Sequence, residues 1–589
     1  MVSCRAARLL VVGLLCACDT KRPQAKSDPG PPPAAPPVVA WGSTRGQVSP
    51  PVIERPVGGL SPAPAPVGVE TPAGAAEHNA TVYPGAEELC GDGVVNDLAR
   101  REAGVTAELC VEVDGTADAF ATFRFMRYSD REDRLTIADL GDLDGDGVHD
   151  LGAGQKDDAL LLGEHVDWST GEIVYDYSTR GSVLVLPGPL SPTTYDDPMY
   201  TWSLPESVYG VDTADRIGAG IAGMGDLDGD GYGDFIFGNL GSPDMVWLAS
   251  GPAFTDMAEA QLIYSEPAGG CASNGAASSP DLSGDGRPDV VIGNPCADLV
   301  LVYEGATLRE GEGLPTPVAR LQSGLGWREG FGGGLHADAD LTGDGVADLV
   351  VAAPAQHLID GVRRPPYVLV YPGPVRGTLG PEDAAVRLTA EVVDEFTEGI
   401  SGAGWALSAG DADGDGYADL AVGDPYFVDW SEFDEDAGWT GGRVSVFPGP
   451  LTRNLLLSES AAKLQTKSPT EGLFGGQVDM RRDLDGDGRA DLFITAGVNR
   501  GENCTCGPGT GGYNAAYIFL APFGGHRFAA SAEITFRNTE VEDWGSQGEV
   551  TGDMTGDGWP DVLIGGPGNY FQVFALPPPG DAGWGGGWR

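Results

Sequence analysis

One nine-residue motif occurs seven times in this chain of 589 residues. It reads Asp-x-Asp-Gly-Asp-Gly-x-x-Asp, with Ser or Thr replacing the second Asp in three copies, and the copies begin at residues 142, 226, 281, 340, 411, 483 and 553. Consecutive copies start between 55 and 84 residues apart. A motif repeated at such a period indicates an array of supersecondary units, and seven units favour a closed ring.

Four β-like runs make up a complete unit of the repeat. In the fourth unit a Gly-rich stretch at 330–335 precedes the motif, and runs at 349–353, 368–371 and 386–389 follow it. Such short runs rich in Val, Leu and Ala, bounded by Gly and Pro, are typical of strands. The chain holds Gly 91 and Pro 45, which are the two worst residues for helix interiors, so the composition disfavours a helical bundle. Each unit is therefore predicted to be a four-stranded propeller blade.

The two ends of the repeat region are predicted to share one blade. The seventh unit ends soon after the run at 571–574 and lacks a fourth strand, whereas an orphan run at 121–126 precedes the first unit and resembles residues 534–537. We expect the orphan run to complete the last blade and so remove an exposed sheet edge. The predicted fold is all-β: a seven-bladed β-propeller with four-stranded blades over residues 116–580, followed by a Gly/Trp tail at 581–589.

The motif has the chemistry of a calcium loop. Alternate side chains of a tight loop converge on one point, Gly permits the sharp reversal, and hard carboxylate oxygens suit Ca²⁺. It is not an EF-hand, because the twelfth position is apolar (Ala153 or Phe237, for example) rather than a bidentate Glu. The formal net charge of -52 also points to cations and argues against nucleic acid as a partner.

Up to seven structural Ca²⁺ ions are expected. Ser283, Thr342 and Thr555 replace an Asp, so their loops carry one charge fewer and are expected to bind more weakly or through water. The alternatives are solvated Asp/Gly turns, or Ca²⁺ ions that bridge directly to a ligand. A further oxygen is expected from the main-chain carbonyl of the seventh residue: Val148, Tyr232, Arg287, Val346, Tyr417, Arg489 and Trp559. The predicted side-chain ligands are Asp142, Asp144, Asp146, Asp150, Asp226, Asp228, Asp230, Asp234, Asp281, Ser283, Asp285, Asp289, Asp340, Thr342, Asp344, Asp348, Asp411, Asp413, Asp415, Asp419, Asp483, Asp485, Asp487, Asp491, Asp553, Thr555, Asp557 and Asp561.

These repeats resemble the FG-GAP family, the β-propeller of integrin α-subunit heads and of many bacterial surface proteins. Phe-Gly-Gly stands intact at Phe331 and Phe474, and Gly-Ala-Pro becomes Gly-Asn-Pro at Gly293 and Gly-Asp-Pro at Gly423. The resemblance implies Ca²⁺ bound in β-hairpin loops, in agreement with the motif chemistry.

The N-terminus indicates export and a membrane anchor. Arg5 and Arg8 precede an apolar run at 9–15, which is too short to span a bilayer but fits a signal-peptide core. Leu15-Cys16-Ala17-Cys18 resembles the lipobox of bacterial lipoproteins, which implies cleavage after residue 17 and lipidation of Cys18. The alternative is an ordinary secretory signal. The resemblance places the protein in a bacterial cell envelope, at the outer membrane or cell surface rather than the inner membrane.

Two further segments separate this anchor from the propeller. Residues 18–80 are rich in Pro, Ala and Gly and are expected to form a disordered tether. Residues 81–115 contain Cys90 and Cys110 and resemble a Cys/Asp-rich metal-binding motif of bacterial surface proteins, although a disulfide-closed loop is the favoured interpretation. An oxidising envelope suits disulfides, and Cys504 with Cys506 is either a strained bridge or two free thiols. The candidate half-cystines are Cys90, Cys110, Cys271, Cys296, Cys504 and Cys506, with Cys90–Cys110 and Cys271–Cys296 as the plausible pairs.

No catalytic constellation is recognisable in the sequence. The six histidines form no metal-spaced pair, and no Gly-x-Ser-x-Gly elbow or phosphate loop occurs. The favoured function is a binding module for protein or polysaccharide, and the alternatives are an enzyme or enzyme accessory domain (as in lyases and phospholipases) and a purely structural envelope protein. The oligomeric state stays open. Aromatic residues in long inter-strand loops are candidate ligand contacts, with loop packing as the alternative: Trp168, Tyr175, Trp430, Phe433 and Trp439.

Overall fold

The computed structural model describes most of the repeat region. All described residues belong to one compact unit within 40–589. The segments at 1–110 and 577–589, and so the predicted signal peptide, tether, most of the Cys90/Cys110 segment and the tail, lie outside the described residues. The described ranges are 111–114, 117–124, 135–155, 159–166, 173–179, 181–195, 201–202, 217–239, 243–251, 260–266, 275–308, 313–325, 330–354, 357–359, 362–390, 402–427, 441–466, 473–497, 514–538, 544–566 and 570–576.

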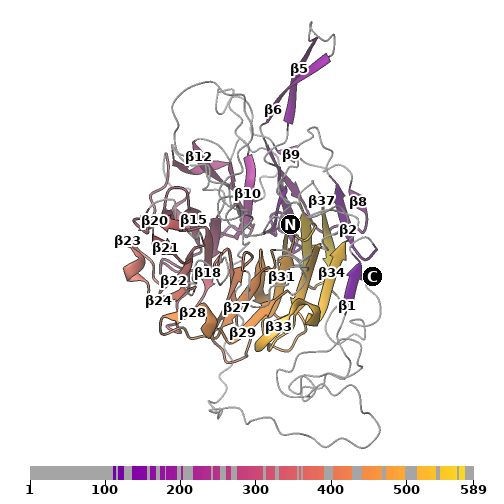
Figure 1. Ribbon diagram of the computed structural model, residues 1–589. Helices are drawn as coiled ribbons and strands as arrows, with labels where there is room; N and C mark the ends of the chain where they lie inside the picture. Colours follow the sequence, from indigo (N-terminus) through magenta and orange to yellow (C-terminus); the bar gives the residue numbers. More distant parts are fainter. Residues whose placement is uncertain are drawn as a thin grey trace, which may run out of the picture. The chain divides into compact units, whose positions relative to one another are not determined.

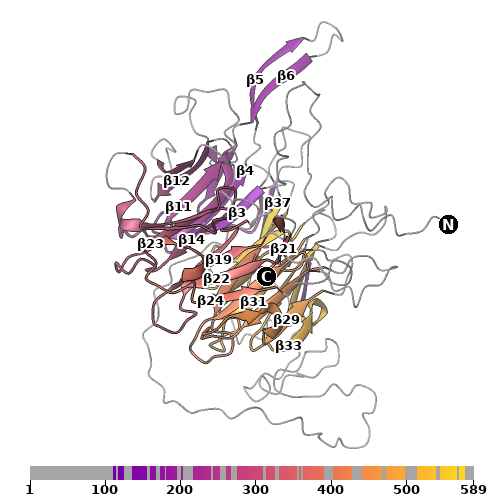
Figure 2. The ribbon, with the colours of Figure 1, turned by 60° about the vertical axis from the view of Figure 1, so that its left-hand side comes forward.

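The fold is a seven-bladed β-propeller, as predicted, and the described residues contain no α-helix. The sheets follow one another in chain order from purple to yellow (Figures 1 and 2). Two small hairpins lie outside the blades, β5 (Ala159–Val166) with β6 (Ile173–Thr179) and β20 (His357–Ile359) with β21 (Val362–Arg364). Within the described ranges no helix is long and apolar enough to cross a membrane.

Each blade contains four antiparallel strands, numbered here as blades 1 to 7. Their order from the first to the fourth strand is as follows: blade 1, β3 (Leu135–Gly141), β4 (Asp150–Gln155), β7 (Ser182–Leu186) and β9 (Thr201–Trp202); blade 2, β10 (Ile217–Gly225), β11 (Asp234–Asn239), β12 (Asp244–Ser250) and β13 (Gln261–Glu266); blade 3, β14 (Gly275–Ser279), β15 (Asp289–Asn294), β16 (Leu299–Glu304) and β17 (Ala319–Leu321); blade 4, β18 (Gly334–Ala339), β19 (Asp348–Ala353), β22 (Tyr367–Tyr371) and β24 (Val386–Thr389); blade 5, β25 (Ala406–Gly410), β26 (Asp419–Asp424), β27 (Arg443–Phe447) and β29 (Ala462–Gln465); blade 6, β30 (Val478–Arg482), β31 (Asp491–Ala496), β32 (Asn514–Phe519) and β34 (Ile534–Asn538); blade 7, β35 (Gln547–Val550), β36 (Asp561–Gly566), β37 (Tyr570–Ala575) and β2 (Ala121–Arg124).

Within the described residues, five blades carry a fifth strand, which differs from the predicted four. In every case this strand runs parallel to the fourth strand and comes from the segment that precedes the fourth strand of the next blade. Each of these strands has only two to four residues, too few to show a period in the sequence. The added strands are β23 (Gly377–Leu379), β28 (Leu455–Leu456), β33 (Gly525–Phe528), β1 (Val111–Asp114) and β8 (Thr194–Tyr195), on blades 3, 4, 5, 6 and 7 respectively.

The sheet of blade 7 joins segments from both ends of the described chain. Strand β2 pairs antiparallel with β37, with Ala121 opposite Val573 and Arg124 opposite Tyr570. The indigo β2 therefore lies beside the yellow β37 in Figure 1. The ring of Phe123 stacks on Phe571 with 4.5 Å between the centroids. This pairing involves part of the run at 121–126 that the sequence analysis assigned to the last blade.

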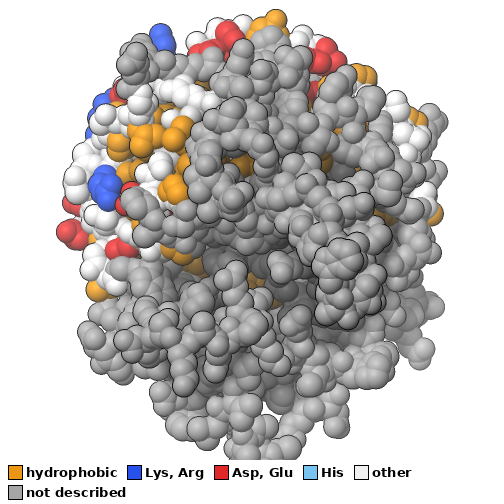
Figure 3. Space-filling view, turned by 90° about the horizontal axis from the view of Figure 1, so that it is seen from above, with side chains coloured by type: hydrophobic (Ala, Val, Ile, Leu, Met, Phe, Trp, Pro, Cys, Tyr) orange, Lys and Arg blue, Asp and Glu red, His pale blue; other side chains and the backbone are white. Residues whose placement is uncertain are grey.

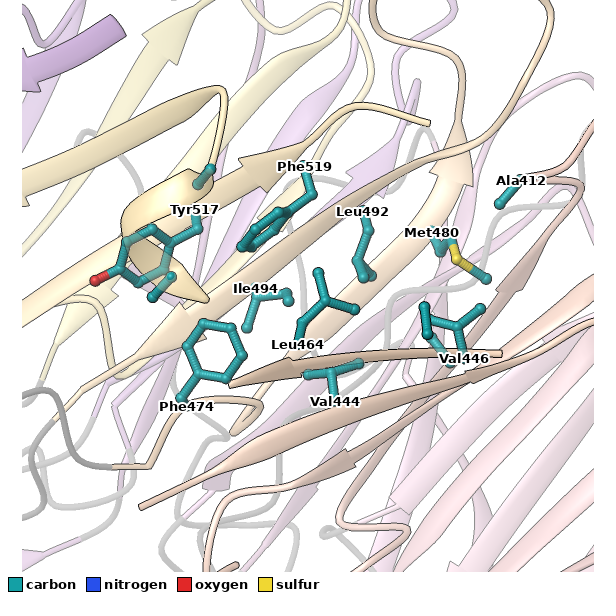
Figure 4. Packing of buried hydrophobic residues seen from close by; sticks show 14 of the residues in the cluster. Ala412, Val444, Val446, Leu464, Phe474, Met480, Leu492, Ile494, Tyr517 and Phe519 are labelled. Atoms are coloured by element: carbon teal, nitrogen blue, oxygen red, sulfur yellow. The ribbon is translucent and has the colours of Figure 1, made fainter. Parts of the chain in front are cut away.

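The hydrophobic core lies between neighbouring blades. All six residues of the second strand are buried in blades 2 to 7, because a blade in the ring is covered on both faces. Figure 4 shows one such cluster, in which Leu464 of blade 5 lies beside Ile494 of blade 6. Phe474, from one of the two intact Phe-Gly-Gly segments, is fully buried in it. The Phe of the repeat therefore serves packing between blades.

Candidate metal loops

Each of the seven motifs forms the turn between the first and second strands of a blade. These turns are called loops 1 to 7, and the ninth residue of each loop begins the second strand. Because the position in the blade is the same every time, the loops share one end of the blades. The loops are residues 142–150, 226–234, 281–289, 340–348, 411–419, 483–491 and 553–561.

The first Asp of each loop organises the backbone of the turn. In loop 1, Oδ1 of Asp142 accepts hydrogen bonds from the N–H groups of Gly145 at 2.7 Å and Asp146 at 3.1 Å, and Oδ2 accepts one from Gly147 at 2.9 Å. The same three bonds occur in the other six loops. Gly145 and Gly147 have φ angles of 81° and 89°, a region that favours Gly. The motif therefore specifies the loop conformation itself.

The ninth Asp lies at the base of the loop, buried. In loop 1, Oδ2 of Asp150 accepts the N–H of Leu143 at 2.7 Å and Oδ1 accepts that of Gly188 at 2.8 Å. Gly188 belongs to the Pro-Gly-Pro that follows the third strand, so Asp150 ties two turns of the blade together. Burial raises the pKa of Asp150 to about 7, even though the two backbone hydrogen bonds oppose the shift.

Burial also raises the pKa of the ninth Asp in other loops. It raises the pKa of Asp561 to about 8 and those of Asp289 and Asp419 to about 6. The pKa of Asp491 is raised well above its ordinary value for the same reason. A buried carboxylate without a nearby positive charge is costly, and a divalent cation in the loop would supply that charge.

Carboxylate oxygens converge in five of the loops. Three carboxylates of each bring one oxygen apiece within 4.8 Å of the others. Sets of oxygen ligands without sulfur or imidazole suit hard cations such as Ca²⁺, so the residues present fit the predicted ion. The converging sets are Asp142, Asp144 and Asp146; Asp226, Asp228 and Asp230; Asp340, Asp344 and Asp348; Asp411, Asp413 and Asp419; and Asp483, Asp485 and Asp491.

Two of the substituted loops turn their third side chain inward. Thr342 Oγ1 lies 3.4 Å from Oδ1 of Asp348, and Thr555 Oγ1 lies 3.3 Å from Oδ1 of Asp561, each hydroxyl donating to the buried carboxylate. These hydroxyls therefore lie beside the ninth residue, a predicted ligand.

Three pairs of neighbouring loops are hydrogen-bonded to one another, which was not predicted from the sequence. In loops 1, 2 and 6 the N–H of the eighth residue donates to the carbonyl of the first residue of the preceding loop. This bond measures 2.7 Å from Gly233 to Asp142 and 2.8 Å from His149 to Asp553. Loop 1 therefore contacts both loop 2 and loop 7. The repeat length gives no signal for such contacts, because they depend on how adjacent blades are rotated.

A charged cluster on the first strands was also missed. Arg481 makes a bidentate pair with Asp479, with Nε–Oδ1 at 2.8 Å and Nη2–Oδ2 at 2.6 Å. Oδ2 of Asp479 accepts the N–H of Val550 in blade 7 at 3.2 Å, and Glu549 Oε2 lies 3.8 Å from Arg481. Burial raises the pKa of Glu549 well above its ordinary value. The polar residues at 479, 481 and 549 were the available signal, since strands in an apolar core seldom carry charges.

Most of the other predicted site residues cannot be placed. Cys18, Trp168, Trp430, Phe433 and Trp439 lie outside the described residues, whereas Tyr175 belongs to β6, where its backbone pairs with that of Glu164. Of the six candidate half-cystines only Cys296 is described, in the turn after β15, so the disulfide pairs stay predictions.

Comparison with known proteins decides the repeat type. The family model described as "FG-GAP repeat" matches residues 403–447, which include loop 5 and the strands on either side of it. Residues 403–447 therefore match an FG-GAP repeat. The FG-GAP motif in this segment thus coincides with a first strand, an Asp loop and the next two strands of one blade.

Integrin α-subunits are among the proteins to which this chain is similar. Integrin alpha-PS5 of Drosophila melanogaster is 32% identical over 173 residues, which are 28% of this chain and 15% of that protein. Integrin alpha-PS2 of the same organism is 30% identical over 226 residues, 37% of this chain and 14% of that protein. Phosphatidylinositol-glycan-specific phospholipase D of Rattus norvegicus is 31% identical over 169 residues, 25% of this chain and 18% of that protein. The chain thus spans less than one fifth of the length of these relatives.

Proposed function

We propose that this FG-GAP propeller is a calcium-stabilised binding module of the cell envelope, which engages a protein or polysaccharide ligand through its loops. The observation that carries the proposal is the sevenfold recurrence of one Asp loop with the same backbone hydrogen bonds. In solvated Asp/Gly turns the buried carboxylate at the base of each loop would lack a compensating positive charge, which a cation in the loop would supply.

Calcium would act on the folded state. The Asp side chains at the first, third, fifth and ninth positions, with the carbonyl of the seventh, would hold the ion, which supplies two positive charges to a cluster of like charges. The seven loops contain 25 such Asp residues. At separations below 5 Å like charges repel by about 1 kcal/mol per pair in water and by several kcal/mol near a protein surface. An ion that binds only the folded chain stabilises it by mass action.

We assign the ligand-binding role to the ends of the blades that lie opposite the Asp loops. The Asp loops occupy the turns between first and second strands, whereas the connections between second and third strands vary in length, from residues 567–569 in blade 7 to residues 156–181 in blade 1. The described part of the molecule seen from above shows hydrophobic side chains interspersed with acidic and basic ones (Figure 3). Mixed surfaces of this kind suit protein and carbohydrate ligands. The similarity to integrin α-subunits supports a binding role.

The first experiment uses the full chain stripped of metal with EDTA. Binding to a panel of glycans and of envelope and matrix proteins is measured in Ca²⁺ and again in EDTA. We expect at least one ligand whose binding requires Ca²⁺. Absence of any ligand for a chain shown by circular dichroism to be folded in Ca²⁺ would overturn the binding-module assignment and favour a scaffold.

The anchor is tested separately. Cys18→Ala should move the protein from the membrane fraction to the soluble fraction, because one acyl-modified Cys is the proposed attachment. An unchanged membrane fraction would contradict the lipid anchor and leave the calcium loops unaffected.

An enzyme accessory role is the second candidate. The similarity to a phospholipase D favours it, although the match covers 18% of that protein. Release of a glycosylphosphatidylinositol-anchored reporter by the purified chain would support this candidate, and no release would exclude that activity.

A further inference from the structure

Arg489, the seventh residue of loop 6, contacts two Asp loops at once. Its Nη1 lies 3.1 Å from Oδ2 of Asp487 in its own loop. Its Nε donates a 3.3 Å hydrogen bond to the main-chain carbonyl of Asp413 in loop 5. Asp413 and Asp487 are both predicted ligands of their loops. One guanidinium therefore lies between two proposed cation sites.

Two further contacts fix this arrangement. A Cβ atom at Gly414, the fourth residue of loop 5, would lie only 3.0 Å from Nε of Arg489, so the side chain covers this glycine. The next residue of loop 6, Ala490, donates its N–H to the carbonyl of Asp411 at 2.7 Å. Asp411 is the residue that organises the turn of loop 5. Residues 489 and 490 thus hold loop 5 through both side chain and backbone.

Loop 3 provides a natural comparison, because it also has an Arg at its seventh position. The residue in loop 2 that corresponds to Gly414 is Gly229, and a Cβ atom there would meet nothing within 4 Å. Arg287 therefore does not cover the neighbouring loop in the way that Arg489 does.

We propose that Arg489 is a positioning residue that sets the calcium affinity of loops 5 and 6 together. The inference rests on the proposed calcium binding. The guanidinium competes with the ion for the Asp487 carboxylate, and it places a positive charge against the backbone of loop 5. Both effects weaken Ca²⁺ binding, so each of the two loops binds less tightly than its Asp residues alone would allow.

The test is calorimetric titration of the metal-free full chain with Ca²⁺. Arg489→Gln removes the charge and the guanidinium that contacts both loops, but keeps a polar side chain. We expect two sites of Arg489→Gln to bind Ca²⁺ about twofold to fivefold more tightly than in the parent, as for partly exposed charges. The matched control Arg287→Gln changes the net charge by the same amount and should tighten one site at most.

The same Arg substitution in a chain that already carries a loop 6 variant shows whether calcium affinity changes in loop 5. In Asp483→Asn, which removes the first ligand of loop 6, Arg489→Gln should still tighten one site, the one in loop 5. If it tightens none there, or if Arg489→Gln and Arg287→Gln change the same number of sites, the bridging role is wrong. If Asp483→Asn does not fold, the comparison of the two Arg variants decides alone. A parent chain that binds no Ca²⁺ would instead overturn the proposed calcium function itself.

Discussion

The main-chain N–H of Asp139 donates a 2.7 Å hydrogen bond to Oε1 of Glu549, across 410 residues of sequence. Asp139 lies in the first strand of blade 1 and Glu549 in the first strand of blade 7. The carboxylate of Asp139 in turn accepts the N–H of Gly552 in blade 7 at 2.7 Å, so each of the two blades donates a hydrogen bond to the other. A buried acid thus joins the first and last repeats of the ring.

Loss of this acceptor should destabilise the folded chain. Glu549→Ala leaves the buried N–H of Asp139 unpaired, which costs about 1–3 kcal/mol of unfolding free energy. Glu549→Gln keeps a carbonyl oxygen for the same bond and should cost less. Denaturant unfolding in Ca²⁺ measures both variants, and equal losses would show that the hydrogen bond is not the cause.

The stacked pair of Phe123 and Phe571 provides a test of blade 7. Phe123 is 1% exposed, and its truncation to Ala should cost about 3–5 kcal/mol. The half-buried Phe120 is the control, and Phe120→Ala should cost clearly less. Similar losses of unfolding free energy for the two variants would contradict a specific stabilising role of the Phe123–Phe571 pair.

The sequence predicted the blades because the blades are built from local signals. The glycines of the Asp loops specify the turn, and runs such as 349–353 are apolar at every position because both faces of the strand are covered. Strand β1 and the other fifth strands escaped prediction, since two to four residues carry no period and their partners lie in another blade. Contacts such as Arg489 with Asp413 depend on the angle between blades, which no local pattern encodes.

In the absence of calcium, the stability of the folded chain should fall as the pH rises. Burial raises the pKa of Asp150 to about 7 and that of Asp561 to about 8. In the metal-free chain the folded state therefore holds protons that the unfolded state releases from about pH 4 upward. Stability contributed by these protons is lost as the pH rises through the folded pKa values. Melting temperatures in EDTA should fall between about pH 5 and pH 8.

Calcium should oppose that fall, because the ion replaces the protons on the same carboxylates. The difference in melting temperature between Ca²⁺ and EDTA should therefore grow as the pH rises. A melting temperature in EDTA that stays constant or rises over this range would contradict the assignment of the ninth Asp as a buried Ca²⁺ ligand with a raised pKa.

A single loop can be disabled by changing its organising residue. Asp142→Asn should remove one Ca²⁺ from the stoichiometry and lower the melting temperature in Ca²⁺, since its carboxylate both shapes the turn and is a predicted ligand. Glu382→Gln, which removes the same charge from an exposed position outside the loops, is the control. Equal calcium stoichiometry in the two variants would count against loop 1 as a site.

The most direct test of the proposed calcium loops is the number of Ca²⁺ ions bound per chain, measured by equilibrium dialysis and elemental analysis of the full chain. We expect seven ions at saturation, with the four all-Asp loops filling before those with Ser283, Thr342 and Thr555. A chain that binds no Ca²⁺, and whose melting temperature is the same in Ca²⁺ and in EDTA, would contradict this expectation.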